Sequence, residues 1–142
     1  MHLSTRTRYG CRAMAEIAAA YPDGVPSIRE IAEKQQVSAK YLEHIMQGLK
    51  AAGLVRAIRG THGGYVLARP PEQITMKEIY QALEGSAAPV PCVDEPTLCD
   101  MVGSCPTRDA WVEMKQAIEE VLGRRTLRDL ARKCSAGAGG RA

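Results

Sequence analysis

The fold is decided by residues 27–69, SIREIAEKQQVSAKYLEHIMQGLKAAGLVRAIRGTHGGYVLAR. Ser27 followed three residues later by Glu30 is a capping-box pattern, and apolar residues continue from there at helical spacing to Val37. A second helical pattern begins at Ser38 and stops at Gly53. Two short helices separated by a tight turn predict a helix-turn-helix.

The segment that follows predicts a β-wing. Residues 54–58 and 64–68 alternate between apolar and polar side chains and are joined by a glycine-rich tip, which is typical of a short hairpin. Apolar residues at helical spacing over 5–21 predict one more helix ahead of the helix-turn-helix. We therefore expect a mainly α protein whose residues 1–70 form a winged helix-turn-helix domain.

The rest of the chain predicts three more helices. Thr75 would cap a helix that ends at Gly85, and Thr126 would cap a last short helix over 127–133. Between them, residues 107–122 carry an apolar face too large for one exposed helix, so we expect a dimerisation helix there. Residues 71–134 would form this second part, with a cysteine loop at 92–105, and residues 135–142 a disordered tail.

Charge and composition narrow the function. Residues 1–69 carry ten Lys and Arg against five Asp and Glu, a net charge of +5, whereas residues 70–142 carry nine against eleven, a net charge of −2. A basic front half suits a nucleic-acid-binding module. No apolar run could cross a bilayer and the N-terminus lacks a signal-peptide core, so we expect a cytoplasmic protein with no membrane partner. No catalytic dyad, phosphate loop or cofactor fold is present, so we expect no enzyme.

Three of the five cysteines lie in one polar stretch, PCVDEPTLCDMVGSCP, residues 91–106. Thiolates at Cys92, Cys99 and Cys105, with no apolar periodicity between them, favour a soft metal or an iron-sulfur cluster. Zinc is the main rival, and structural cysteines are a weaker one. Cys11, inside the first helix, fits a small core residue, and Cys134 an incidental thiol.

These features together resemble the IscR, NsrR and CymR group of bacterial winged-helix transcription regulators. The resemblance rests on YLE at 41–43, RGTHGGY at 59–65, LEG at 83–85 and the Cys-x6-Cys-x5-Cys loop, and it covers nearly the whole chain. It implies a homodimer that binds a double-stranded DNA operator under the control of an iron-sulfur cluster, with 2Fe-2S favoured over 4Fe-4S. A cluster-free regulator of the CymR kind, controlled by a partner enzyme, by zinc or by thiol oxidation, is the alternative. A metal-trafficking or redox protein is a distant third.

The second helix of a helix-turn-helix enters the major groove, so its exposed residues are candidate base readers. Glu43 could accept from a cytosine amino group, a role that the resemblance also implies; the alternative is a surface Glu paired with a lysine. Arg59, beside glycines at the wing tip, could enter a narrow minor groove. Ser4, Arg6, Arg8 and Ser27 are candidate phosphate contacts. The predicted DNA-binding residues are Ser38, Lys40, Tyr41, Glu43, His44, Arg56, Arg59, Gly60 and His62.

The cysteine loop offers three thiolates where a cluster needs a fourth donor. In the IscR branch that donor is a histidine, and the matching position here is Arg108, which has no free lone pair. In the NsrR branch it is an N-terminal aspartate, and the matching position here is Arg8. Thr107 and Asp109 are candidates, as are Cys134, Cys11, His2, a partner residue, an exogenous thiol and water, and none stands out.

Overall fold

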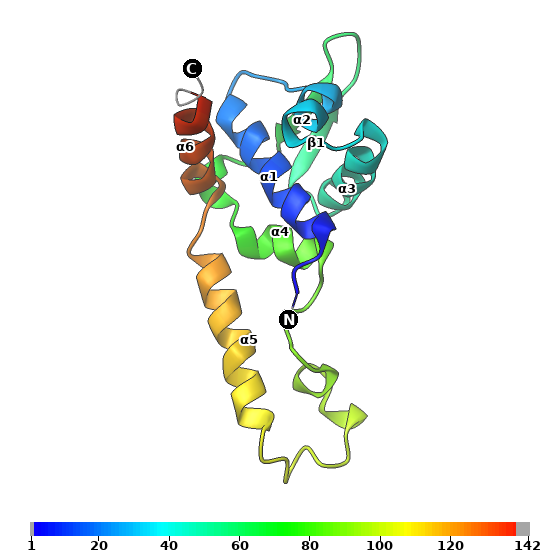
Figure 1. Cartoon of the computed structure of the whole chain (residues 1–142), viewed down its shortest axis with the longest axis vertical. Coiled ribbons are helices and arrows are strands. Elements are labelled where there is room, and N and C mark those ends of the chain that lie inside the picture. Colours follow the sequence, from blue (N-terminus) through cyan, green and yellow to red (C-terminus); the bar gives the residue numbers. More distant parts are fainter. Residues whose placement is uncertain (1, 139–142) are drawn as a thin grey trace.

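The computed structural model describes residues 2–138 and has two visibly different parts (Figure 1). Most of the helices and a β-hairpin pack together at one end, and one long helix with the cysteine loop extends away from them (Figure 1). The helices are α1 (Thr5–Ala20), α2 (Ile28–Gln35), α3 (Ala39–Ala51), α4 (Met76–Leu83), α5 (Arg108–Gly123) and α6 (Leu127–Ala138). This confirms the mainly α prediction.

The helix-turn-helix forms where the sequence predicted it. The Ser27 hydroxyl accepts from the Glu30 backbone N–H, and the Glu30 carboxylate accepts from the Ser27 N–H, so the predicted capping box begins α2. Gln36 takes the left-handed conformation with φ of 57°, which ends α2 and turns the chain toward α3. The Ser38 hydroxyl then accepts from the Tyr41 N–H and caps α3.

The wing is a two-stranded antiparallel hairpin of β1 (Val55–Ile58) and β2 (Gly64–Leu67). Its register pairs Val55 with Leu67 and Ile58 with Gly64. Each strand is one residue shorter than the sequence pattern suggested, because Leu54 and Ala68 lie just outside the ladder. At the tip, Gly60 has φ of 113°, a conformation that disfavours any residue with a Cβ.

One core serves both parts of the sequence. Ile74, Ile79 and Leu127, all fully buried, join the same apolar cluster as α1, α2 and α3. Two backbone hydrogen bonds hold the start of α6 beside the start of α4. The Met76 N–H donates to the Arg125 carbonyl at 2.8 Å, and the Leu127 N–H donates to the Ile74 carbonyl at 2.9 Å. The boundary expected at residue 70 therefore does not separate two cores.

The C-terminal helix is longer than the sequence indicated. α6 packs against α1 and continues to Ala138, whereas its predicted end was residue 133 and the predicted disordered tail began at 135. Residues 135–138 of the predicted tail therefore belong to α6. Residues 139–142 of that predicted tail lie outside the described residues. Between residues 2 and 138, none of the helices is long and apolar enough to span a membrane.

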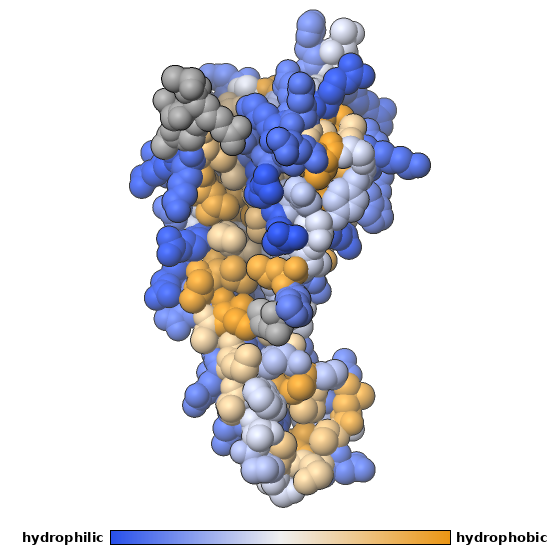
Figure 2. Space-filling view, in the orientation of Figure 1, coloured by the Kyte–Doolittle hydropathy of each residue, from blue (hydrophilic) through white to orange (hydrophobic). Residues whose placement is uncertain are grey.

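α5 stands apart from this core. None of its residues is buried, and Met114 and Val121 are 39% and 48% exposed. Figure 2 shows hydrophobic side chains along α5 and where it meets the rest of the molecule. Its main contacts within the described chain are with α4 and with the start of the cysteine loop, and part of its apolar face is left uncovered.

Candidate DNA-binding surface and cysteine loop

One face of α3 is exposed and polar. Ser38, Lys40, Glu43 and His44 are all exposed, while Leu42, Ile45, Met46 and Leu49 on the opposite face are fully buried. The core therefore fixes the rotation of the helix and leaves the predicted base-reading residues open to a partner. Their roles in binding DNA stay predictions.

Tyr41 differs from its neighbours on α3. It is half-buried and packs against the core, and its ring meets Tyr9 edge-on with centroids 6.3 Å apart. The Arg12 guanidinium lies 5.2 Å from the centroid of the Tyr9 ring. Such contacts are worth about 0.5–1.5 kcal/mol beyond burial. Part of the surface of Tyr41 is therefore committed to holding α3 against α1.

Gln47 is exposed one helical turn beyond Glu43. Residues four apart on a helix share a face, so a surface that presents Glu43 presents Gln47 as well. A glutamine amide can read adenine through two hydrogen bonds. Sequence reasoning missed this residue, although the spacing from Glu43 was already sufficient to find it.

The wing carries a second exposed group of candidates. Arg56, Arg59, Gly60 and His62 are all exposed. In the part of the chain that the structure describes, neither arginine nor Lys40 takes part in an ion pair. These cations are therefore available for phosphate oxygens.

The N-terminal candidates divide into two kinds. Arg8 is exposed and can reach a phosphate, whereas Arg6 is half-buried and its Nε atom is buried without a hydrogen-bond partner among residues 2–138. The Ser4 and Ser27 hydroxyls accept from backbone N–H groups as helix caps. Part of the Arg6 guanidinium is therefore covered by the fold, and its phosphate role stays a prediction.

The cysteine loop lies at the end of the molecule away from the wing (Figure 1). Two 3-10 turns shape it, η2 (Pro91–Val93) and η3 (Pro96–Leu98), so Cys92 lies within the first and Cys99 directly follows the second. All three cysteines are partly exposed free thiols, and no residue from 91 to 106 is buried. Within residues 2–138, no three His, Cys, Asp or Glu side chains are gathered as a metal would need.

Thr107 is the fourth-ligand candidate that touches a cysteine. Its Oγ1 lies 3.5 Å from Cys105 Sγ, and its side chain makes no cap for α5. This hydrogen bond, together with the Thr107 and Arg108 backbone and the Arg108 charge, lowers the pKa of the Cys105 thiol. Asp109 is exposed in the first turn of α5. Thus the structure supplies a thiolate-favouring environment and leaves the fourth donor unassigned.

An ion pair fastens the loop to α5. Lys115 Nζ lies 2.6 Å from an Asp94 carboxylate oxygen, and this hydrogen bond lowers the pKa of Asp94 and raises that of Lys115. The pair joins the turn that holds Cys92 to the second turn of α5. A change in the loop would therefore reach α5 through a direct contact.

The other two cysteines lie elsewhere. Burial raises the pKa of the Cys11 thiol to about 11, and its side chain packs against the core, as the sequence indicated. Burial also raises the pKa of Cys134, near Glu16. Both are far along the chain from the cysteine loop, and neither joins a metal-binding group within the described residues.

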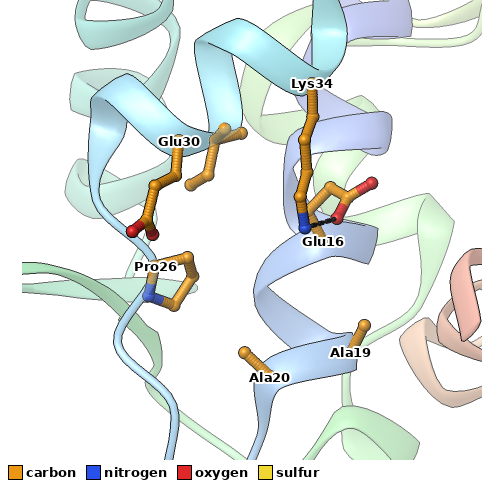
Figure 3. A pocket seen from close by; sticks show the side chains of 7 residues that line it. Glu16, Ala19, Ala20, Pro26, Glu30 and Lys34 are labelled. Carbon is orange, nitrogen blue, oxygen red and sulfur yellow. Dashed lines mark hydrogen bonds and ion pairs between the residues drawn. The ribbon is translucent and has the colours of Figure 1, made fainter. Parts of the chain in front are cut away.

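A pocket of about 310 Å³ lies between α1 and α2 (Figure 3). Ala19, Ala20, Pro26 and Ile31 give it an apolar lining. Its charged groups are already engaged, since Lys34 pairs with Glu16 at 3.2 Å and Glu30 caps α2. The pocket therefore presents no unsatisfied charge to a ligand.

Comparison with known proteins places this geometry in a family. The sequence pattern of Rrf2, described as iron-dependent transcriptional regulator, matches residues 3–133. The chain belongs to the Rrf2 family. It is 40% identical over 135 residues to Protein rrf2 of Nitratidesulfovibrio vulgaris, covering 95% of this chain and 90% of that protein. The Rrf2 family consists of transcription regulators, which confirms the regulator class and the expectation of no enzyme.

Two solved structures resemble this chain to nearly the same extent. CymR, the global cysteine regulator of B. subtilis, superposes with a TM-score of 0.78 at 37% identity, covering 94% of this chain and 98% of that one. IscR of T. potens superposes with a TM-score of 0.77 at 36% identity, covering 94% and 88%. The winged-helix prediction is therefore confirmed, while likeness alone does not separate a CymR-type from an IscR-type mode of control.

Proposed function

We propose that this Rrf2-family regulator is a homodimer whose affinity for its DNA operator is set by an iron-sulfur cluster on Cys92, Cys99 and Cys105. The main support for this proposal is the position of these thiols. They share one loop with no buried residue, at the N-terminal end of the exposed helix α5. Such a loop contributes little to the core, so its cysteines are free to serve a ligand.

The dimer proposal rests on α5. Trp111, Met114, Ile118 and Val121 recur at spacings of three and four, the pattern of a helix-helix seam. None is buried in the single chain. A second copy of α5 laid against this face would remove apolar surface from water at about 25 cal/mol per Å². The resulting pair would carry two winged units, as a two-fold symmetric operator requires.

The cysteine loop fits a cluster by the chemistry of its donors. Three soft thiolates are the ligands that iron-sulfur clusters take, and closing them together displaces no core residue, because none between 91 and 106 is buried. When bound, the cluster would supply a centre sensitive to iron supply, oxygen or nitric oxide. We favour 2Fe-2S over 4Fe-4S. Thr107 is the leading fourth ligand because it already contacts Cys105.

A cluster-free thiol or zinc switch is the second candidate. Its thiol-oxidation form is supported by Arg108, which cannot donate a lone pair, and by the three thiols, which are not gathered around one point within the described chain, since a thiol switch needs no fourth ligand. Under this proposal the loop would respond to oxidation or to zinc, and the DNA-binding unit would be the same. A metal-trafficking protein has no comparable support.

Anaerobic purification followed by visible spectroscopy, iron and sulfide counts tests the choice. A brown protein with equal iron and sulfide supports the cluster, and Cys92→Ala, Cys99→Ala and Cys105→Ala should each lose the colour, whereas Cys134→Ala should keep it. A colourless protein that holds zinc or no metal supports the second candidate. The same preparations, with and without the bound group, are then titrated with operator DNA, and equal affinities would rule out control by this loop.

A further inference from the structure

The LEG segment, Leu83–Glu84–Gly85, lies at the end of α4. It joins the DNA-reading unit to the residues that lead into the cysteine loop. Leu83 is 8% exposed and fills the space between α1 and α3. A methyl group added to Gly10 of α1 would overlap Leu83 Cδ1, and one added to Gly48 of α3 would lie 3.3 Å from Leu83 Cδ2. The end of α4 is therefore wedged against two glycines, one on each helix.

Arg6 of α1 also lies against Gly48 of α3. Its Nη2 atom lies 2.9 Å from the position of a methyl group on Gly48, so the guanidinium rests on the backbone of α3. The charge of Arg6 also acts on Glu84. Residues from α1, α3 and α4 thus meet in one contact at the recognition helix.

Glu84 ties this contact to the start of α1. Its Oε1 accepts from the Ser4 backbone N–H at 2.7 Å, a bond between residues 80 positions apart. Ser4 is the N-cap of α1, and its hydroxyl accepts from the Thr7 N–H. The Glu84 carboxylate therefore completes the cap of α1 from another element, and the hydrogen bonds from Ser4 keep the pKa of Glu84 low.

Gly85 connects α4 to the segment that leads to the cysteine loop. It has φ of 91°, which a residue with a Cβ rarely adopts, and from it the chain leaves α4 for the cysteine loop. Six residues separate Gly85 from Cys92. This short segment connects the loop to Glu84 and Leu83 along the chain.

We propose that Leu83, Glu84 and Gly85 form the connection through which the cysteine loop and the DNA-reading unit sense each other. Glu84 is a positioning residue in this connection: it fixes the first turn of α1 and, through Leu83 and Arg6, the second half of α3. The inference deepens the proposed function, since it names the route of control, but it depends on no particular ligand in the loop. Coupling between two sites is reciprocal, so DNA bound at α3 must also affect the loop.

Hydrogen exchange on the full chain tests the connection in wild type, Glu84→Ala and Glu95→Ala. Glu95 is the matched control, an exposed loop carboxylate whose side chain takes part in no hydrogen bond or ion pair within residues 2–138. In the free protein, Glu84→Ala should speed exchange of residues 5–8 and 46–50 by about five- to tenfold, the effect of a lost helix cap. Glu95→Ala should leave both segments unchanged.

The DNA arm uses the duplex that the wild-type protein selects from a randomised pool. Binding of this duplex should slow exchange across residues 85–105 in wild type and in Glu95→Ala, and should no longer do so in Glu84→Ala. Glu84→Asp, which keeps the charge and shortens its reach, replaces the alanine variant if that variant does not fold. The proposed connection would be overturned if DNA left the exchange rate of residues 85–105 unchanged in wild type. It would also be overturned if the Glu84 variant showed the same exchange rates as wild type. Iron content, measured on the same samples, decides the cluster proposal separately.

Discussion

The Tyr65 backbone N–H donates to the Pro26 carbonyl oxygen at 3.0 Å, which ties the second strand of the wing to the loop before α2. Gly64 comes next to this bond, and a Cβ there would overlap the Pro26 carbonyl. The wing is therefore held close to the helix-turn-helix by a backbone contact that only a glycine allows. This contact links the two elements that carry the exposed groups of candidate DNA-binding residues.

Gly64→Ala should destabilise the protein by about 1–3 kcal/mol, because the new methyl group meets backbone atoms that cannot turn aside. Urea unfolding measures the change. Gly103→Ala is the control, since a Cβ at Gly103 meets no atom within 4 Å. Equal midpoints for the two variants would show that the wing accommodates the methyl group freely.

Glu43→Ala should relax base preference more than it lowers affinity. A carboxylate that accepts from cytosine discriminates by about 1–3 kcal/mol, and its removal also relieves repulsion from phosphates. Competition between the selected duplex and single-base variants measures the loss. Glu33→Ala removes an exposed carboxylate on α2 and should leave the preference intact. An unaltered preference in Glu43→Ala would remove Glu43 from base reading.

Arg59→Ala should weaken DNA binding and reduce the slope of log K against log salt concentration by about 1, as expected for the loss of one cation at the duplex. Arg59 is exposed and takes part in no ion pair within the described chain, so its removal should cost little folding stability. Titrations at several salt concentrations test this. Lys133→Ala, on the exposed surface of α6, should keep the wild-type slope; the same slope in Arg59→Ala would place Arg59 away from DNA.

The double change Met114→Glu and Val121→Glu should dissociate the dimer at micromolar concentration. Both side chains are exposed in the single chain, so the folded protomer should survive, while charges buried in the α5 seam should cost about 2 kcal/mol or more. Sedimentation velocity and circular dichroism measure the two effects. Glu113→Gln on the exposed side of α5 is the control. A dimer that persists would place the subunit interface elsewhere.

Cys11 should be the slowest of the five cysteines to react with iodoacetamide in the folded protein. Its pKa of about 11, against 9.0 for a free thiol, leaves about a hundredfold less thiolate at pH 8, and burial restricts access further. Mass spectrometry after timed labelling gives the order. Because the folded pKa is raised, Cys11 should also make the fold less stable as pH rises from 9 toward 11, and Cys11→Ala should remove that part of the slope.

Local elements were largely predictable from the sequence. The predicted capping box at Ser27 and the predicted caps at Thr75 and Thr126 are present in the structure. The helix-turn-helix and hairpin follow from apolar spacing. The exposed candidates on α3 and in the wing were also found from that spacing, because burying one helix face exposes the other. The place of Arg6 against Gly48 of α3 was not predictable in this way, because it joins residues far apart in the sequence.

The family fold, the three-cysteine loop and the polar face of each helix can be read from local patterns, since these depend on residues within a few positions of one another. Tertiary structure alone decided that α6 returns to complete the core, that Glu84 caps α1 across 80 positions, and that the cysteine loop lies outside the core on an uncovered helix. Such contacts join residues distant along the chain. Which residues meet in such contacts depends on how whole helices and strands pack, and a local sequence pattern does not specify this packing.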